Sequence, residues 1–412
     1  MKYILKTTIL ATTLLSSFIF SCSTKTKINL ETKKLAVKSD TSTTKLNFSV
    51  EETPEWTALF KRESGWFGAD GIFAIPLNGV DTAGAATDTS TMLLFSDSLI
   101  GKITNGKLEN NYKMINNTVA IVEGVEPRAN NITFYWDKNN TGEPKSIFVP
   151  NTPKTQPGDY YWLGDGFVNT AKNNNTYIFG YRIQNTGAAV FGFKEVGNTL
   201  IIIPAGSRPP FKNQRQIDTP FFLKGNSESE YGSFGAGIFV NTKAAGAPNP
   251  DGYVYVYGLR GKAKNVMVAR VQPENFEIFG QWRYWDGTTW NTDINKVANI
   301  TNRASNELSV TPLADGRYAL VFQTDGTGKT VGLRLGLSPQ GPYGPIITIW
   351  DCSEVLEIDK DFFTYNAKVH SNLSKPGELL ISYNVNSYDF FKDILVYPDL
   401  YRPRFIKVKF KE

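Results

Sequence analysis

The sequence predicts an all-β domain that follows a short N-terminal export segment. Runs rich in Val, Ile, Tyr, Phe and Trp recur along the chain, and Gly, Asn, Asp and Pro interrupt them, which is typical of strands joined by turns. Stripes of apolar residues with helical spacing are few. About 360 residues follow the N-terminal segment, more than one ordinary core holds unless the strands build a sandwich, a barrel or a propeller.

Residues 1–21 have the pattern of a signal peptide. Lys2 and Lys6 supply positive charge, and the apolar segment 9–20 is too short and too rich in hydroxyl side chains to span a bilayer. The run IFSC, which ends at Cys22, resembles a bacterial lipoprotein box, in which the cysteine is lipidated. Its bulky phenylalanine leaves ordinary secretion as the alternative. We therefore expect an exported, lipid-anchored protein of the outer membrane or facing the periplasm.

Residues 22–48 are expected to form a flexible tether, because Ser, Thr and Lys dominate and the apolar content is too low for a core. Lysines outnumber acids here by four charges, and the signal peptide adds two more, so within the net charge of +5 the remaining body carries −1. The tether lysines can lie near anionic headgroups. The nearly neutral body argues against nucleic-acid binding.

Residues 49–412 contain five groups of strand-like runs. Four groups hold four runs each: 71–77, 91–98, 117–124 and 132–137; 160–168, 176–183, 188–195 and 199–205; 231–240, 253–260, 265–271 and 276–285; and 306–313, 318–324, 330–338 and 345–350. The fifth holds 365–373, 378–385 and 404–410, and the run KLNFSV at 45–50 would complete it. We therefore predict a five-bladed β-propeller closed by pairing of the N- and C-terminal strands, which removes the open edge. A two-sheet assembly is the alternative.

An ionisable residue recurs at the first strand of each group. These residues are Asp70, Asp165, Glu230 followed by Tyr231, Glu307, and, in the last group, His370. First strands line the central channel of a propeller, so these side chains would converge there. In glycoside hydrolysis one carboxylate activates a water or attacks the sugar, and a protonated partner donates to the leaving oxygen. We predict Asp70, Glu307 and Asp165 as the catalytic residues.

Aromatic, amide and charged side chains near these acids are the candidates for sugar binding. Aromatic faces can stack on the C–H faces of sugar rings, while sugar hydroxyls bond to Asn, Asp and Arg. Trp66 and Trp162 lie within a few residues of a predicted channel aspartate. The predicted substrate-binding set is Trp66, Asp97, Asn117, Trp162, Glu230, Tyr231, His370, Asn384 and Arg404.

Most of these residues also have a purely structural explanation. Asp70 and Asp165 each precede a glycine, and Asp-Gly is a common turn. A lone histidine is usually a satisfied interior residue, and aromatic side chains often pack between sheets. Arg404 can pair with Asp399, and Cys352 is expected to be a small buried apolar residue.

Several other chemistries lack the residues that they need. A single histidine makes a serine triad improbable and excludes a multi-histidine metal site. If Cys22 is lipidated, Cys352 has no partner for a disulfide. The run DGTGKT at 325–330 is too short for a phosphate-binding P-loop, and no Gly-x-Ser-x-Gly elbow occurs.

Several runs together resemble one family of exported bacterial proteins. They are GWFGADGIFAIPL, LLFSDSLIG, MINNTVAI, GYVYVYGL with VMVARV, NELSVTPLADGRYALVFQ, LSPQGPYG, YNAKVHSNLS, and ELLISYNVNS with YRPRFIKV, and they span about 65–410. The family is classed as a domain of unknown function. It looks related to the five-bladed propeller glycosidases of the arabinanase and xylosidase type, and a similar family has been linked to cleavage of D-arabinan.

The resemblance implies a role for four of the residues. By position, Asp70 matches the catalytic base of the propeller glycosidases, Glu307 the acid, and His370 a channel histidine that often lies near a bound cation. Asp165 lies one blade too early for the aspartate that tunes the acid, and Glu230 has the right blade but the wrong residue type. A Ca²⁺ ion near His370 is the one cofactor that the resemblance suggests, and none is required.

These observations favour a catalytic function and leave two alternatives. We expect a monomeric lipoprotein that hydrolyses an arabinan- or xylan-like glycan by inversion, with a carbohydrate substrate, a membrane anchor and no nucleic-acid partner. The first alternative is a glycan-binding lipoprotein without catalysis, in which the acids are turn residues. The second is a structural or adhesion propeller that presents loops to a protein partner, which a large exposed apolar patch would favour.

Overall fold

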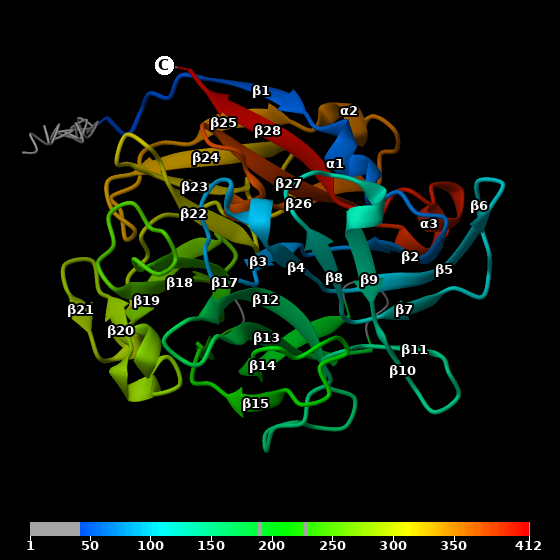
Figure 1. Cartoon of the computed structure of the whole chain (residues 1–412), viewed down its shortest axis with the longest axis horizontal. Coiled ribbons are helices and arrows are strands. Elements are labelled where there is room, and N and C mark those ends of the chain that lie inside the picture. Colours follow the sequence, from blue (N-terminus) through cyan, green and yellow to red (C-terminus); the bar gives the residue numbers. More distant parts are fainter. Residues whose placement is uncertain (1–41, 188–191, 226, 228–229, 412) are drawn as a thin grey trace, which may run out of the picture. The chain divides into compact units, whose positions relative to one another are not determined.

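The structure, a computed structural model shown in Figure 1, describes residues 42–187, 192–225, 227 and 230–411. The predicted signal peptide, the lipidation site Cys22 and most of the predicted tether lie outside the described residues. The domain is all-β, as predicted. Its α-helices are short: α1 (Pro54–Ala58), α2 (Ser353–Leu356) and α3 (Phe390–Val396). Across the part of the chain that is described, no helix is long and apolar enough to cross a membrane.

Five antiparallel sheets carry most of the strands. Sheet I is β3 (Phe73–Pro76), β4 (Ser90–Phe95), β8 (Thr118–Glu123) and β9 (Ile132–Tyr135), and sheet II is β12 (Tyr160–Asn169), β13 (Asn175–Asn185), β14 (Phe193–Ile203) and β15 (Arg215–Asp218). Sheet III is β16 (Phe222–Leu223), β17 (Gly232–Asn241), β18 (Tyr253–Arg260), β19 (Asn265–Val271), β20 (Arg283–Trp285) and β21 (Trp290–Asn291). Sheet IV is β22 (Leu308–Pro312), β23 (Tyr318–Gln323), β24 (Thr330–Gly336) and β25 (Ile347–Asp351).

Sheet V joins the two ends of the domain. It consists of β26 (Phe362–Val369), β27 (Glu378–Ser387), β28 (Arg404–Phe410) and β1 (Phe48–Glu52). Strand β1 lies antiparallel to β28, with Val50 opposite Val408, and Figure 1 shows the two strands side by side. The fifth predicted group had only three runs, and the run 45–50 was expected to complete it. The pairing of β1 with β28 confirms that this segment supplies the fourth strand of sheet V.

The structure differs from the predicted strands in several places. Residues 188–191 of the predicted run 188–195 lie outside the described residues, and the rest of it joins the run 199–205 in the single strand β14. Strand β15 is the fourth strand of that sheet. Only the end of the run 276–285 is a strand, because turns occupy its first part. An additional sheet of β2 (Ser64–Ala69), β5 (Ser98–Thr104), β6 (Lys107–Leu108) and β7 (Lys113–Ile115) was not predicted, nor was the pair β10 (Asp137–Lys138) and β11 (Pro144–Lys145).

The first long strands of successive sheets contact one another: β3 contacts β12, β12 contacts β17, β17 contacts β22, and β22 contacts β26. Two glycines permit this close approach. A Cβ on Gly164 would lie 2.6 Å from the carbonyl oxygen of Gly235, and a Cβ on Gly237 would lie 2.6 Å from that of Leu308. Any larger residue would force the neighbouring backbones apart, so the glycines of the GDG and FGAG runs serve packing.

Apolar side chains fill the spaces between the sheets. Ile75, Leu94 and Ile178 belong to one buried cluster that joins sheets I and II, and Val256 and Phe234 belong to another within sheets II and III. Each such side chain stabilises the fold by roughly 1.5–3 kcal/mol relative to exposure. Cys352 is buried in the core, as predicted.

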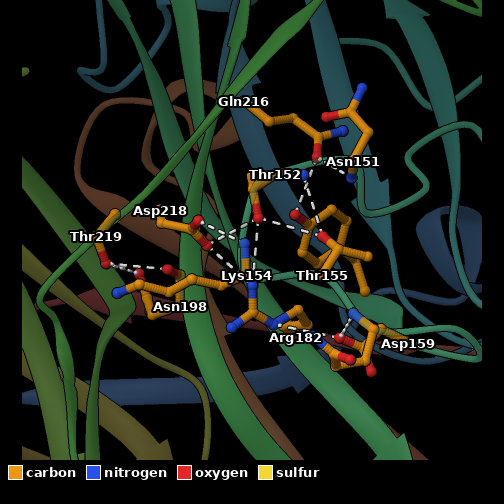
Figure 2. A network of polar contacts seen from close by, with 12 residues as sticks. Asn151, Thr152, Lys154, Thr155, Asp159, Arg182, Asn198, Gln216, Asp218 and Thr219 are labelled. Atoms are coloured by element: carbon orange, nitrogen blue, oxygen red, sulfur yellow. Dashed lines mark hydrogen bonds and ion pairs between the residues drawn. The ribbon is translucent and has the colours of Figure 1, made fainter.

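A buried arginine fixes the loop in front of β12 (Figure 2). Nη1 of Arg182, on β13, lies 2.9 Å from Oδ1 of Asp218, and Nε lies 3.4 Å from Oδ2 of Asp159. The Thr152 hydroxyl also donates to Asp218, at 2.8 Å. The Arg182 guanidinium pairs with both carboxylates and balances one of their two negative charges, so we assign this network to structure. It holds the segment that leads into β12, the strand that carries Trp162.

The described end of the predicted tether contacts the domain. Nη1 of Arg317 donates to the carbonyl oxygens of Ser42 and Lys45, at 2.6 and 2.7 Å. A Cβ on Gly344 would clash with the backbone of Thr43. Residues 42–45 therefore lie against sheet IV.

Candidate active site

A cleft of about 850 Å³ opens among the sheets. Residues of sheets II, III and V line it together with Asp70 and with loop residues next to the strands of sheet IV, which are Asn306, Glu307 and Thr327. Four of the predicted site residues line this cleft: Asp70, Trp162, Tyr231 and Glu307. The two candidate acids come from distant parts of the chain, Asp70 from the turn between β2 and β3 and Glu307 from the residue before β22. The fold therefore brings the predicted acid pair to one cleft.

Asp70 is held by tyrosine hydroxyls. The Tyr365 hydroxyl donates to Oδ2 of Asp70 at 2.8 Å, while Oδ1 has no partner in the described residues. Burial, followed by the negative charges of Asp97 and Glu307, raises the pKa of Asp70 to about 8. Gly71 follows with φ +64°, a conformation that glycine adopts without strain, so the turn aims the carboxyl group into the cleft.

Glu307 is buried, with 7% of its surface exposed, and both of its oxygens are engaged. Nδ2 of Asn366 donates to Oε1 at 2.8 Å, and Nζ of Lys368 lies 2.6 Å from Oε2. Burial raises the pKa of Glu307, and the Lys368 ammonium opposes that rise. Because Lys368 is itself buried, this ion pair acts with little screening by solvent.

A bulge in β26 produces this arrangement. The pairing of β26 with β27 shifts register between Tyr365 and Lys368, and Asn366 has φ +59°. In a regular strand, neighbouring side chains point to opposite faces, whereas a bulge redirects them. Tyr365 thereby reaches Asp70 while Asn366 and Lys368 reach Glu307. The sequence run TYNAKVH contains an asparagine, which tolerates positive φ, but nothing else in it signals the bulge.

The two acids are near neighbours. A Cβ added to Gly71 would lie 3.4 Å from Oε1 of Glu307, so the residue after Asp70 packs directly against the second carboxylate. Asp97 adds a third acid beside Asp70. It accepts a hydrogen bond from Asn116 at 3.2 Å, and burial raises its pKa to about 6, which the polar groups of Trp162 and Asn116 oppose.

Asp165 does not line this cleft, contrary to the predicted catalytic role. It lies on a separate small cavity of about 40 Å³, which Lys368 also lines. Its Oδ1 accepts the backbone N–H of Gly166 at 2.8 Å, and its Oδ2 accepts that of Ile238 at 2.7 Å. The second bond crosses from sheet II to sheet III. Asp165 therefore joins two sheets, although burial raises its pKa to about 8.

Three more predicted binding residues are structural. Trp66 is 1% exposed and stacks on Phe134, with ring centroids 4.3 Å apart, because its strand packs that face into the core. Asn117 is fully buried and donates to two backbone carbonyls, so it satisfies loop ends. Arg404 donates to the carbonyl oxygens of Arg402 and Asp399, which leaves its guanidinium tied to its own loop.

The remaining predicted residues also lie off the cleft. His370 is 2% exposed, and its Nε2 lies 2.8 Å from the Ser382 hydroxyl. Burial lowers the pKa of His370 to about 3, so the ring is neutral. Asn384 is buried within β27, and Glu230 is exposed without lining the cleft. Strand direction alone could not separate these residues from those that face the cleft.

The residues around His370 do not fit a Ca²⁺ site. Ca²⁺ takes six to eight oxygen ligands, usually including carboxylates. Among the described residues, Asp359, Asp361 and Asp393 bring carboxylate oxygens within 4.8 Å of one another, and His370 is not part of that group. The proposed chemistry therefore involves the side chains of the cleft alone.

Sequence reasoning missed several residues of the cleft. Glu195, on β14, lines it, and burial raises the pKa of Glu195 to about 8, against the effect of a hydrogen bond with Ser233. Tyr365, Asn366 and Phe363, on β26, also line it. Glu195 lies inside a strand and carries no local signal, since only the packing of the sheet decides which face meets the cleft.

Comparison with solved structures shows the fold. A candidate hydrolase from Bacteroides ovatus is 21% identical, with a TM-score of 0.66, over 87% of this chain and 90% of that one. An α-L-arabinofuranosidase from Clostridium thermocellum matches more loosely, with 11% identity and a TM-score of 0.42 over 76% of this chain and 82% of that one. A GH62 hydrolase in complex with xylotriose is 9% identical, with a TM-score of 0.44, over 88% of this chain and 96% of that one.

The sequence comparisons give one assignment. None of the curated proteins matches the sequence. A family model matches residues 54–410, nearly the whole of the described domain. The chain therefore belongs to the family described as "Domain of unknown function (DUF5005)", as the runs that include Asp70 and Glu307 led us to expect.

Proposed function

We propose that this chain hydrolyses glycosidic bonds in a polysaccharide, with Asp70 and Glu307 as its general acid and base. The observation that carries the proposal is that these two carboxyl groups line one cleft, together with aromatic side chains that suit a sugar ring. Acid pairs whose surroundings differ are the usual signature of acid and base roles.

The surroundings favour Asp70 as the proton donor. The Lys368 ammonium, 2.6 Å from Glu307, stabilises an ionised Glu307, whereas Asp70 has two negative neighbours, Asp97 and Glu307. A shared proton therefore resides on Asp70 rather than on Glu307. The family resemblance implies the opposite assignment, and the Lys368 ion pair is our reason for exchanging the two roles.

The proposed reaction is an inverting hydrolysis. Asp70 gives its proton to the glycosidic oxygen as the bond from that oxygen to the anomeric carbon breaks. Glu307 accepts a proton from a water whose oxygen attacks that carbon from the opposite face, and proton exchange with solvent restores both groups. Inverting enzymes keep their carboxyl groups roughly 6.5–9.5 Å apart to admit this water.

We also propose that sheets I to V are the five blades of a propeller. The successive contacts of β3, β12, β17, β22 and β26 support this arrangement, and the pairing of β1 with β28 would close it. Such a ring gathers side chains from all five sheets at one opening.

Export with a lipid on Cys22 remains part of the proposal. Its support is the sequence pattern of residues 1–22 alone. Labelling cells with a radioactive fatty acid would mark the protein, and Cys22→Ser would remove the label. A Cys22→Ser protein that is labelled as strongly as the wild type would contradict the anchor.

The test is a screen of the purified protein against arabinan, xylan, pectin and host glycans for new reducing ends. Asp70→Asn and Glu307→Gln should both abolish release from the polymer that is cleaved. A dinitrophenyl glycoside of the same sugar needs no proton to leave, so Asp70→Asn should keep most of its activity there while Glu307→Gln loses it. The reverse pattern would restore the roles that the resemblance implies.

Proton NMR of the first product gives the stereochemistry, and inversion of the anomer is expected. If no polymer yields reducing ends but one binds, the chain is a glycan-binding protein without catalysis. A role in contacting a protein partner is favoured by one observation only, the exposed apolar side chains Phe391, Leu395 and Val396 of α3.

A further inference from the structure

We propose that the cleft binds a glycan chain that passes across the acid pair, with sugar rings stacked on aromatic side chains on both sides of it. The inference rests on the proposed function, because it names the part of the polysaccharide that this site takes. It implies cleavage within a chain rather than removal of the terminal sugar.

The first aromatic group lies on sheet II. Trp162, on β12, packs edge-on against Phe193, on β14, with ring centroids 4.5 Å apart, and Tyr160 lies 6.1 Å from Trp162. Trp162 and Phe193 both line the cleft, and Phe193 is 40% exposed. Large aromatic surfaces left at the wall of a cleft are typical of ligand contact.

The second aromatic group lies on sheet V. Phe363 and Tyr365, on β26, line the cleft with ring centroids 5.4 Å apart. Tyr388 continues the row, since its ring lies 4.7 Å from that of Phe363 and the residue is 52% exposed. The row therefore runs from the inside of the cleft to the surface.

Asp97 and Asp70 come between the two groups in the order of contacts. Trp162 adjoins Asp97, which adjoins Asp70, and Asp70 accepts the hydrogen bond from Tyr365. The contacts thus run in one order: Phe193, Trp162, Asp97, Asp70, Tyr365, Phe363, Tyr388. A site for a terminal sugar needs an aromatic platform on one side of the acids only.

The chemistry of the row fits a carbohydrate. Aromatic faces can stack on the C–H faces of sugars. Asn386 lines the cleft and donates to the Tyr365 hydroxyl at 3.3 Å. Its amide is of the kind that bonds to sugar hydroxyls. The cleft volume of about 850 Å³ is near the upper end of the usual ligand pockets, which are about 300–1,000 Å³, so it has room for more than one ring.

The test measures binding against chain length in the inactive protein Asp70→Asn/Glu307→Gln. Calorimetry compares xylobiose with xylohexaose and arabinobiose with arabinohexaose. We expect the longer member of one pair to bind at least about tenfold tighter. Adding Trp162→Ala or Tyr388→Ala should weaken binding of the long member about 3- to 10-fold and leave the short member less affected.

The matched control is Phe391→Ala, which removes an aromatic side chain that is 66% exposed and does not line the cleft. It should leave both affinities unchanged. Since Tyr388 is exposed, Tyr388→Ala keeps the test valid even if Trp162→Ala fails to fold. Equal affinity for short and long chains, or equal losses for both in the variants, would overturn the inference.

The outcomes separate this inference from the proposed function. If the polymers are never cleaved but long chains bind through Trp162 and Tyr388, the chain-binding inference stands and hydrolysis fails. If active protein releases only single sugars from chain ends, hydrolysis stands and the inference fails.

Discussion

Asp70 and Asp165 begin from nearly the same local sequence, GADGIF and LGDGFV, and end in different chemistry. Burial raises the pKa of both to about 8. Asp70 meets tyrosine hydroxyls and two other acids on a cleft of about 850 Å³. Asp165 accepts two backbone N–H groups and joins two sheets.

The comparison shows that a shifted pKa does not by itself identify a catalytic acid. What distinguishes the two aspartates is the kind of partner and the room beside the carboxyl group. Backbone donors that the fold must satisfy make Asp165 structural, whereas an unpartnered oxygen in a roomy cleft leaves Asp70 available to a substrate.

The largest expected effect separates the two aspartates by activity. Asp70→Asn should lower kcat on the cleaved polysaccharide about 10²- to 10⁴-fold, because general acid catalysis contributes that much. Asp165→Asn should keep kcat within about threefold when it is measured well below its melting temperature. Initial rates of reducing-end release give both numbers. Equal losses in the two variants would make Asp165 part of the catalytic machinery.

The free energy of unfolding should separate the two aspartates in the reverse order, with the larger loss at Asp165. Asp165→Ala leaves the N–H groups of Gly166 and Ile238 buried without an acceptor, at about 1–3 kcal/mol each. Asp70→Ala frees the hydroxyl of Tyr365, a residue that lines the cleft, and a water in the cleft can replace the lost partner, so the change should cost less than about 1 kcal/mol. Urea unfolding followed by circular dichroism measures both. A larger loss for Asp70→Ala would reverse the interpretation.

The Lys368–Glu307 pair predicts a shift in the pH profile. Lys368→Met removes the ammonium that stabilises the ionised Glu307, so the pKa of Glu307 rises and the acidic limb of kcat/KM moves upward by about 1–3 pH units. Lys264→Met is the control, because Lys264 lines the cleft and has no ion pair with Glu307 among the described residues, and it should leave that limb in place. If the acidic limb of kcat/KM does not move in Lys368→Met, Glu307 is not the general base.

The smallest expected effect is on stability against pH. Asp165, which faces Asp81 and Lys368, has a folded pKa of about 8 against 3.8 for an unperturbed aspartate. Between these values the folded state binds the proton more tightly, so this contribution is complete below about pH 4 and is lost as the pH rises through 8. The melting temperature should therefore fall between about pH 4 and pH 8, the window between the two pKa values. The melting temperature of Asp165→Asn should fall less over this range than that of the wild type. An equal fall in both proteins would contradict the raised pKa of Asp165 in the folded state.

Much of the fold could be predicted from local patterns. Alternating apolar residues and turn residues located the strands of sheets I, IV and V closely. They failed at β14, where a continuous strand crosses a polar run, and at the sheet of β2 and β5, whose pairing joins segments separated by β3 and β4. Pairing between distant segments leaves little trace in either segment alone.

The candidate site was predicted only in part, for the same reason. Asp70, Trp162, Tyr231 and Glu307 were found because acids and aromatic residues near first strands were sought there. Glu195, Lys368 and the bulge at Asn366 were missed, since their effect depends on which strand lies opposite. Trp66 and His370 were included in the predicted binding set although both are buried, because a strand pattern does not say which face packs into the core.

The sequence by itself determined an all-β chain with ionisable groups near its first strands, because turn chemistry and apolar alternation act over a few residues. Only the tertiary structure decided which aspartate faces the cleft. The partners of Asp70 and Asp165, Tyr365 and Ile238, lie far from them along the chain, and hydrogen bonds act only between groups that the packing of the sheets has already brought together.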